Sequence, residues 1–537
     1  MHSRQFIKEQ NHKICQSEWW GPLKGTALLS DNIYLYVPPL HFCHELHKCF
    51  EPLADKIKEK QSTNKMALRY YTKLVKSLRL FEHAKVRYRT LFGCLALSIC
   101  FLLVVRPSLE GPVKTVYSKM WMGSGCPSTV MIGNKDSSQQ FAAESEKKIF
   151  PNNSICDISK PRSNFCEMKG DIRIHGNSSE ILLVSSSQMG HYMENETWKI
   201  KPYARKEDSR AMSGVRELSL KSLTGHDQAP SCSIYHSVPA LVFSTSGYTG
   251  NYFHDFTDVL VPLFITSRQY HGDIQFLITN FQAWWVDKYH VILKHLSKYE
   301  IINFDHEHKV HCFSNAFVGL RSHKELSIDP TRSPNGYSMY DFIRFLRSSY
   351  SLVRHYAITI GEDGGKKPRL MIVSRKGARA FTNVGEIVEM ARSLGYEVVV
   401  SEAEFGTSLS KVSQIVNSCD VMMGVHGAGL TNVVFLPTNA ILIQVVPFGE
   451  TEWICRTAFG EPSVDMKIRY LEYKMEEKES TLTEQYPHDH PVRRDPGSIA
   501  KQGWDALATI YLGKQNVKLD VARFRDTLLQ ALELLHH

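Results

Sequence analysis

The sequence predicts an α/β protein with two doubly wound, Rossmann-like halves. Apolar runs of strand length alternate with amphipathic stretches of helix length twice along the 537-residue chain. Such β-α-β alternation is typical of parallel sheets covered by helices. The length exceeds what a single hydrophobic core organises. An apolar content of 43% and a charged content of 22% are those of a globular protein.

The first half is expected to begin near residue 166 and to end near residues 350–360. The apolar and amphipathic patterns predict strands at 171–176, 181–184, 238–244, 274–279 and 299–304, and helices at 253–267 and 285–298. The order of these elements predicts a parallel sheet.

The second half shows the same alternation. We expect strands at 369–374, 397–400, 421–425 and 441–446, and helices at 383–394 and 409–418. A helical period at residues 520–535 predicts a C-terminal helix that packs on either half.

The positive charge of the chain is concentrated in one short segment. The net charge is +9, of which residues 66–90 contribute +6 and residues 91–537 only +1. A nucleic-acid-binding protein carries its basic residues across a folded face. We therefore expect no nucleic-acid partner.

Residues 91–105 form an uncharged apolar run directly after this basic segment. As a helix the run spans about 22 Å, short of the roughly 27 Å hydrocarbon of an early secretory membrane. The alternatives are a cleavable signal peptide, which lacks a small-residue cleavage site here, and a core helix, which the cationic flank disfavours. We interpret the run as a signal anchor, which places residues 1–90 in the cytosol and the rest in a lumen.

The segments on either side of this anchor lack a clear hydrophobic period. Residues 106–165 are expected to form a stem. Residues 1–65 precede Met66, which stands just before the basic segment. We hypothesise that Met66 is the functional initiator and that residues 1–65 are an extension of the gene prediction.

Glycosylation and disulfide signals agree with a lumenal location. The three N-glycosylation sequons begin at Asn152, Asn177 and Asn195, all beyond the apolar run. Seven cysteines also follow the run, so at least one thiol stays unpaired within the chain. Cys156 and Cys166 are close enough in sequence to close a small loop, and a lumen permits such disulfides.

The stretch after the predicted strand 421–425 indicates a nucleotide-phosphate site. It consists of His426, Gly427, Ala428, Gly429, Leu430, Thr431 and Asn432. The glycines let a ligand approach the backbone, the helix start offers N–H groups to an anion, and the histidine adds a titratable donor. The alternative is an ordinary tight βα turn, since the spacing is neither a dinucleotide fingerprint nor a P-loop.

Two arginines follow another predicted strand. Arg375 and Arg379 stand directly after residues 369–374, where cationic side chains can neutralise a diphosphate. The alternative is a solvated basic loop.

A histidine and two carboxylates lie near the start of the predicted helix 253–267. His254, with Asp255 or Asp258 nearby, suits an oriented general base. The alternative is an ordinary polar helix face. Close by, Trp284 and Trp285 could stack on a sugar, although aromatic side chains are more often core.

Several common site motifs are absent from the sequence. No D-x-D triplet, zinc-type Cys/His spacing or G-x-S-x-G elbow occurs. The sequence therefore predicts no metal site, and no tightly bound cofactor is expected.

These motifs resemble those of plant members of glycosyltransferase family 61. The resemblance rests on residues 372–383 and 421–437, with further matches at 250–258, 285, 288–289, 311–313 and 479–482, and it covers roughly residues 150–537. It implies a GT-B fold, with residues 166–355 as the acceptor domain and 356–537 as the nucleotide-sugar domain. It also implies type II anchorage in the Golgi membrane and metal-independent, inverting transfer from a UDP-sugar.

Within that family the chain looks most like the xylan-decorating enzymes of grasses. We therefore expect a UDP-pentose donor (arabinofuranose or xylose), a xylan acceptor and other xylan-synthesising enzymes as partners. The turn and the two arginines would hold the UDP diphosphate, and His254, Asp255 or Asp258 would be the base, with Glu404 in reserve. The alternatives are a β-1,2-xylosyltransferase of N-glycans, a non-catalytic scaffold on the same fold, and an anchored lectin.

Overall fold

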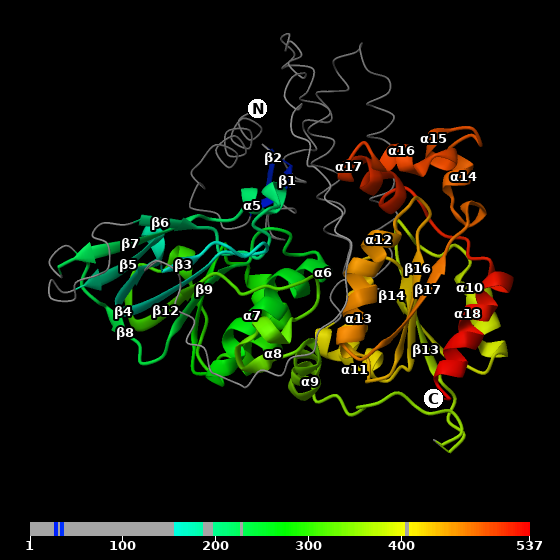
Figure 1. Ribbon diagram of the computed structural model, residues 1–537, viewed down its shortest axis with the longest axis horizontal. Helices are drawn as coiled ribbons and strands as arrows, with labels where there is room; N and C mark the ends of the chain where they lie inside the picture. Colours follow the sequence, from blue (N-terminus) through cyan, green and yellow to red (C-terminus); the bar gives the residue numbers. More distant parts are fainter. Residues whose placement is uncertain are drawn as a thin grey trace, which may run out of the picture. The chain divides into compact units, whose positions relative to one another are not determined.

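The structure is a computed structural model that describes residues 26–30, 33–36, 155–185, 197–225, 229–362, 364–402 and 408–536 (Figure 1). The expected anchor at 91–105, the sequons at Asn152 and Asn195, and Glu404 lie outside these residues. Among the described helices, none has the length and apolar character needed to cross a membrane. The chain divides into two compact units, Met1–Phe141 and Ala142–His537.

The first unit contributes one described hairpin. Strand β1 (Thr26–Ser30) pairs antiparallel with β2 (Ile33–Tyr36). All of the following elements belong to the second unit.

The N-terminal part of this unit is built on a ten-stranded mixed sheet. Its strand order is β11-β10-β9-β12-β4-β5-β7-β6, with β3 added to β4 and β8 to β12. The strands are β3 (Cys156–Asp157), β4 (Phe165–His175), β5 (Glu180–Ser185), β6 (Thr197–Ile200), β7 (Leu218–Thr224), β8 (Ile234–Tyr235), β9 (Ala240–Ser244), β10 (Gln275–Thr279), β11 (Ile302–Asn303) and β12 (Val310–Val318).

The prediction of an all-parallel sheet is wrong for this half. Strands β9, β10 and β11 are parallel, but β4 pairs antiparallel with both β5 and β12. The connection from β4 to β5 is only residues 176–179, too short for the crossover that parallel strands need. In β7 the buried residues alternate, whereas β9 is buried throughout. The sheet is therefore covered on both faces at β9, whereas one of its faces is less buried at β7.

Helices connect the parallel strands of this sheet. One continuous helical segment follows β9 and comprises α6 (Tyr252–His254), the π-helical η4 (Asp255–Leu260) and α7 (Val261–Ser267). Helix α8 (Ala283–Leu296) follows β10. The remaining helices of this part are η2 (Gly176–Ser178), α5 (Ser209–Ser213), η5 (Arg268–Tyr270), η6 (Phe304–His306), η7 (Pro330–Arg332), η8 (Pro334–Gly336) and α9 (Met339–Ser349).

The C-terminal part confirms the predicted parallel sheet. Its order is β14-β13-β15-β16-β17, and every pair is parallel. The strands are β13 (Arg369–Ser374), β14 (Glu397–Glu402), β15 (Val421–Val425), β16 (Ile441–Val446) and β17 (Arg469–Lys474). Strand β17 was not predicted, because it is an edge strand with little burial and hence no apolar run.

Helices lie on both faces of this second sheet. Helices α10 (Val384–Ser393) and α18 (Val521–Leu534) lie on one side, and α12 (Glu452–Cys455) and α13 (Glu461–Asp465) on the other (Figure 1). The other helices are α11 (Leu409–Asn417), η9 (Ala428–Phe435), η10 (Arg456–Gly460), η11 (Glu477–Glu479), α14 (Leu482–Gln485), α15 (Pro491–Arg494), α16 (Pro496–Ala500), α17 (Trp504–Leu507) and η12 (Ala508–Leu512).

One hydrophobic cluster joins the helices of the two sheets. The ring of Phe256, in η4, makes edge contacts with Phe342 of α9 and Phe435 of η9. All three side chains are buried. Since η9 continues from the 426–432 turn and η4 from His254, this packing brings both sequence motifs to the same boundary.

Two disulfides brace the first sheet. Cys156 bonds to Cys166 across the β3–β4 pair, and Cys232 bonds to Cys312. Cys419 and Cys455 are buried free thiols. Residues 155–165, expected to be stem, thus belong to the folded part through β3 and this disulfide.

Candidate active site

The glycine turn is shaped by backbone conformation and by two neighbouring side chains. After β15, Gly427 has φ +150°, which favours glycine, and η9 begins at the next residue. A Cβ at this position would lie 2.5 Å from Nη1 of Arg375 and 3.2 Å from Nη1 of Arg379. The turn therefore needs glycine because the two guanidinium groups pack against its backbone.

The structure brings the two predicted arginines together at this turn. Nη1 of Arg379 donates to the carbonyl of His426 at 2.9 Å, and Nε of Arg375 donates to the carbonyl of Ala378 at 3.1 Å. Within the described residues neither guanidinium forms an ion pair with a carboxylate, and Nε of Arg379 is buried without a partner.

The charge of this arginine pair is poorly compensated. Burial lowers the pKa of Arg375, and burial together with the nearby Arg375 charge lowers the pKa of Arg379 to about 10. Buried charge is costly unless an opposite charge accompanies it. Bidentate donors in this setting suit an anion with several oxygen atoms, such as a diphosphate.

The surroundings of His426 set its protonation state. The ring is buried, and its Nδ1 lies 2.7 Å from Nε2 of Gln444. Burial, with the Arg379 and Arg375 charges, lowers its pKa to about 3. With this pKa the ring is neutral near pH 7, and its contact with the donor phosphate stays a prediction. The amide of Gln444 donates to Nδ1, which leaves the proton on Nε2.

The predicted His254–carboxylate arrangement is present with one of its two candidate partners. Nδ1 of His254 lies 2.8 Å from Oδ2 of Asp258. The carboxylate is buried and also accepts hydrogen bonds from Tyr203, Arg205 and Arg162. This leaves Nε2 of His254 to accept a proton, since no described residue bonds to it and the side chain is 19% exposed.

Asp255 faces away from His254 into the core. It accepts hydrogen bonds from the backbone N–H of Gly250, Nε1 of Trp285 and the hydroxyl of Tyr289, and it is fully buried. With these partners Asp255 holds the loop before His254, and of the two carboxylates it is Asp258 that bonds to the imidazole.

The predicted aromatic pair is also divided between two roles. Trp285 is buried in the core, whereas Trp284 is 48% exposed. The indole of Trp284 lies beside Gly250, with 3.6 Å between its Cη2 and a Cβ built on that glycine. A flat, accessible ring thus lies next to the residue that stands four positions before His254.

Direct contacts link the histidine helix to the glycine turn. The hydroxyl of Tyr252 donates to Oδ1 of Asn432 at 3.0 Å. The ring of Phe459 contacts both Phe253 and His426, with centroid distances of 5.4 and 5.8 Å. Phe459 lies in η10, a π-helical segment like η4, and such segments are frequent at functional sites. Arg375 and Arg379, which have no carboxylate partner among the described residues, and the oriented imidazole of His254 therefore border the same region.

Comparison with known proteins identifies this arrangement. The sequence profile of glycosyltransferase family 61 matches residues 252–443. The chain is 47% identical to the alpha-1,3-arabinosyltransferase XAT2 of Oryza sativa subsp. japonica, over 75% of this chain and 68% of that protein. It is 44% identical to the rice beta-1,2-xylosyltransferase XYXT1, over 82% and 95% of the two chains. The chain belongs to glycosyltransferase family 61.

The chain is also 38% identical to the xylan glycosyltransferase MUCI21 of Arabidopsis thaliana, over 70% of this chain and 78% of that protein. The chain is thus a glycosyltransferase, and the family match spans His254, both site arginines and the glycine turn.

Other residues of this family 61 site were not found from the sequence. Arg162, Arg205 and Glu325 form the network that holds Asp258, and Gln444 sets the tautomer of His426. They come from distant segments, so no local spacing could have identified them. Of the described residues, only Asp171, Cys232 and Cys312 group like metal ligands, and both sulfurs are in the disulfide.

Proposed function

We propose that this glycosyltransferase moves a pentose, arabinofuranose or xylose, from a UDP-sugar to the xylan backbone with inversion. The observation that carries the diphosphate assignment is the pair of half-buried guanidinium groups at the Gly427 turn, neither of which pairs with a carboxylate among the described residues. The pentose and the xylan acceptor are supported by the relatives, which are named arabinosyl-, xylosyl- and xylan glycosyltransferases.

The reaction is a single in-line displacement at the anomeric carbon. Nε2 of His254 takes the proton of the acceptor hydroxyl, whose oxygen forms the new bond to that carbon. The bond between the anomeric carbon and the diphosphate oxygen breaks, and UDP leaves with the electron pair. Asp258 stabilises the imidazolium through Nδ1. Arg375 and Arg379 stabilise the negative charge that develops on UDP.

The acceptor is proposed to lie against Trp284. Its exposed ring, close to Gly250 and hence to the start of α6, offers a stacking surface beside the base. The proposal also includes the fold and the location of the enzyme. We propose that two GT-B domains follow a Golgi signal anchor at residues 91–105 in the sequence, that the site lies in the lumen, and that the transfer needs no metal ion.

A donor screen tests the proposed reaction. The full-length chain is incubated with UDP-arabinofuranose, UDP-xylose or UDP-GlcNAc and xylo-oligosaccharides, and products are identified by mass. Transfer of a pentose is expected, and transfer from UDP-GlcNAc alone would overturn the assignment.

A binding experiment tests the diphosphate site separately. UDP should raise the thermal midpoint of the wild-type chain, as any ligand of the native state does. Arg375→Ala should remove that effect, whereas Arg392→Ala, an exposed arginine of α10, should preserve it. Equal UDP stabilisation in all three chains would refute the site.

A further inference from the structure

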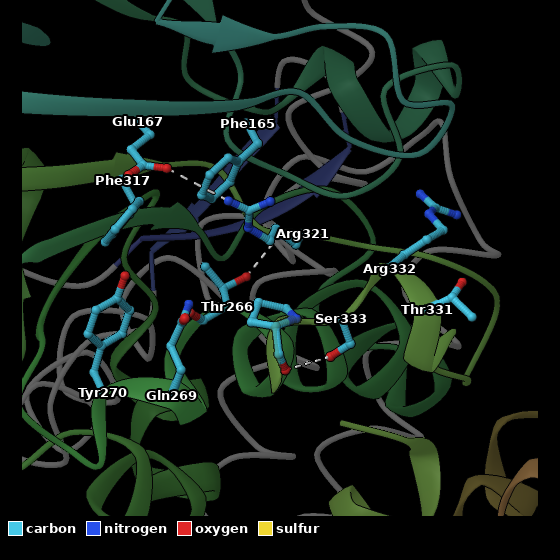
Figure 2. Close-up of a pocket in the computed structure, with 11 residues that line it drawn as sticks. Phe165, Glu167, Thr266, Gln269, Tyr270, Phe317, Arg321, Thr331, Arg332 and Ser333 are labelled. Atoms are coloured by element: carbon cyan, nitrogen blue, oxygen red, sulfur yellow. Dashed lines mark hydrogen bonds and ion pairs between the residues drawn. The ribbon is translucent and has the colours of Figure 1, made fainter. Parts of the chain in front are cut away.

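A cavity of about 310 Å³ lies apart from the residues described above. The end of α7 and η5 form one side of it, and the loop after β12 with η7 forms another (Figure 2). It shares no lining residue with the glycine turn or with His254. Thr266, which lines the cavity, is twelve residues after His254 in the same helical segment. At the rise of an α-helix this separates the two residues by about 18 Å along the helix axis.

Arg321 is the central charged group of this cavity. Its Cζ lies 4.0 Å from the centre of the Phe165 ring, which holds the guanidinium plane in place. Its backbone N–H donates to Oγ1 of Thr266 at 2.9 Å, which fixes the loop against α7. Figure 2 shows the guanidinium beside the Phe165 ring, with dashed lines that join Arg321 to Glu167 and Thr266.

The guanidinium of Arg321 is incompletely neutralised. The nearest carboxylate oxygen, on Glu167, is 3.9 Å from Nη2, which is too long for a hydrogen bond. Glu167 also pairs with Lys169 at 2.9 Å. Among the described residues no side chain accepts a hydrogen bond from this guanidinium, and burial lowers its pKa. The side chain is 33% exposed, so its N–H groups are accessible to a ligand.

A second arginine strengthens the positive character of the cavity. Arg332, at the end of η7, also lines it and has no carboxylate within 4 Å in the described part of the chain. Glu167, which Lys169 already shares, and Asp157 lie near Arg321, and Asp329 lies near Arg332; in the described part of the chain none of these carboxylates accepts a hydrogen bond from either guanidinium. Guanidinium donors that lack a carboxylate acceptor favour an anionic ligand, and the planar fork of arginine matches a carboxylate.

The other walls suit a sugar. The hydroxyl of Tyr270 remains protonated, because burial raises its pKa to about 12, and the amide of Gln269 stands beside it. The rings of Phe165 and Phe317 complete the lining. Both rings are buried and stack on each other, so they form a rigid base below the polar groups. A volume of roughly 300 Å³ is at the lower end of the range for small-molecule sites.

We propose that this cavity is a second carbohydrate-binding site, which takes a carboxylate-bearing sugar residue such as a uronic acid. Arg321 binds the carboxylate, Tyr270 and Gln269 bind the hydroxyls, and Arg332, whose side chain points away from Arg321, adds positive charge at the edge of the cavity. The site needs no donor nucleotide, so it stands apart from the proposed transfer reaction.

Calorimetric titration of the full-length chain tests this proposal without any donor. D-glucuronate is compared with its methyl ester, which keeps the sugar and removes the charge. We expect millimolar binding of glucuronate and at least tenfold weaker binding of the ester, since one lost charge-assisted contact corresponds to about tenfold.

Variants locate the binding. Arg321→Lys keeps the charge and loses the fork, so it should weaken glucuronate binding about tenfold. Arg332→Ala removes a more distant charge and should weaken binding less. Arg392→Ala and Arg375→Ala should bind like the wild-type chain, and the latter separates this site from the proposed UDP site. Equal binding of acid and ester, no binding at all, or equal competition by inorganic phosphate would overturn the proposal.

Discussion

Oδ2 of Asp258 lies 2.8 Å from Nδ1 of His254. The carboxylate belongs to a network of ion pairs that neutralises its charge without a contribution from the imidazole. Arg162 and Arg205 each bond to Asp258 and also to Glu325. Two guanidinium groups therefore balance two carboxylates. The network positions His254 firmly, while its Nε2 stays available to the acceptor.

His254→Ala should lower kcat strongly and leave UDP binding intact. A general base contributes about 10²- to 10⁴-fold in rate, whereas the diphosphate contacts are made by other residues. The measurement is steady-state transfer together with a UDP thermal-shift assay. His290→Ala, an exposed histidine of α8, is the matched control. Turnover of His254→Ala near the wild-type rate would assign the base elsewhere.

Arg379→Met should stabilise the free protein and weaken UDP binding. The side chain is half-buried without a carboxylate partner, and its Nε is buried with no hydrogen-bond partner among the described residues. Replacing it with an apolar chain removes a desolvation cost, for an expected gain of about 1 kcal/mol in unfolding free energy. The loss of a charge-assisted contact should cost about 2 kcal/mol in UDP affinity. Urea denaturation and UDP titration measure the two effects, and a destabilised variant would contradict this account.

Gly427→Ala should abolish UDP-dependent stabilisation. The new Cβ would meet Nη1 of Arg375 at 2.5 Å, and φ +150° is strained for alanine. Gly385→Ala is a sharp control, because this helical glycine has open space around it. That substitution should raise stability by about 0.5–1 kcal/mol. If both variants bind UDP like the wild-type chain, the turn does not carry the ligand.

His426 should make the fold less stable as the pH falls. Its pKa is about 3 in the folded protein, against an ordinary value of 6.5, so the unfolded chain binds more protons between these limits. The stability contribution is present above pH 6.5 and is lost as the pH falls towards 3, by at most about 1.4 kcal/mol per pH unit. His323, with a pKa of about 4, acts in the same direction.

Urea denaturation from pH 7 to pH 4 measures this slope. His426→Gln should reduce it, and the exposed His290→Ala should not. A slope unchanged in His426→Gln would show that His426 is not buried in its neutral form.

Local sequence patterns predicted much of this fold and part of the site. The strand at 369–374 and the strand at 421–425 have the bounds that their apolar runs indicate, because parallel strands buried on both faces need such runs. The mixed first sheet was missed, because strand direction depends on which strands pair and short apolar runs do not record it. The anchor at 91–105 remains a prediction, and Golgi location remains a proposal.

The sequence by itself determined which residues could do chemistry: the glycine turn, Arg375, Arg379 and His254. Residue type and position after a strand are local properties, and the chain carries them directly. Only the tertiary structure decided between Asp258 and Asp255, made His426 neutral and left the arginine pair without a carboxylate among the described residues. Those outcomes depend on burial and on partners far along the chain, such as Arg162 and Gln444, which are brought close only when the two sheets fold.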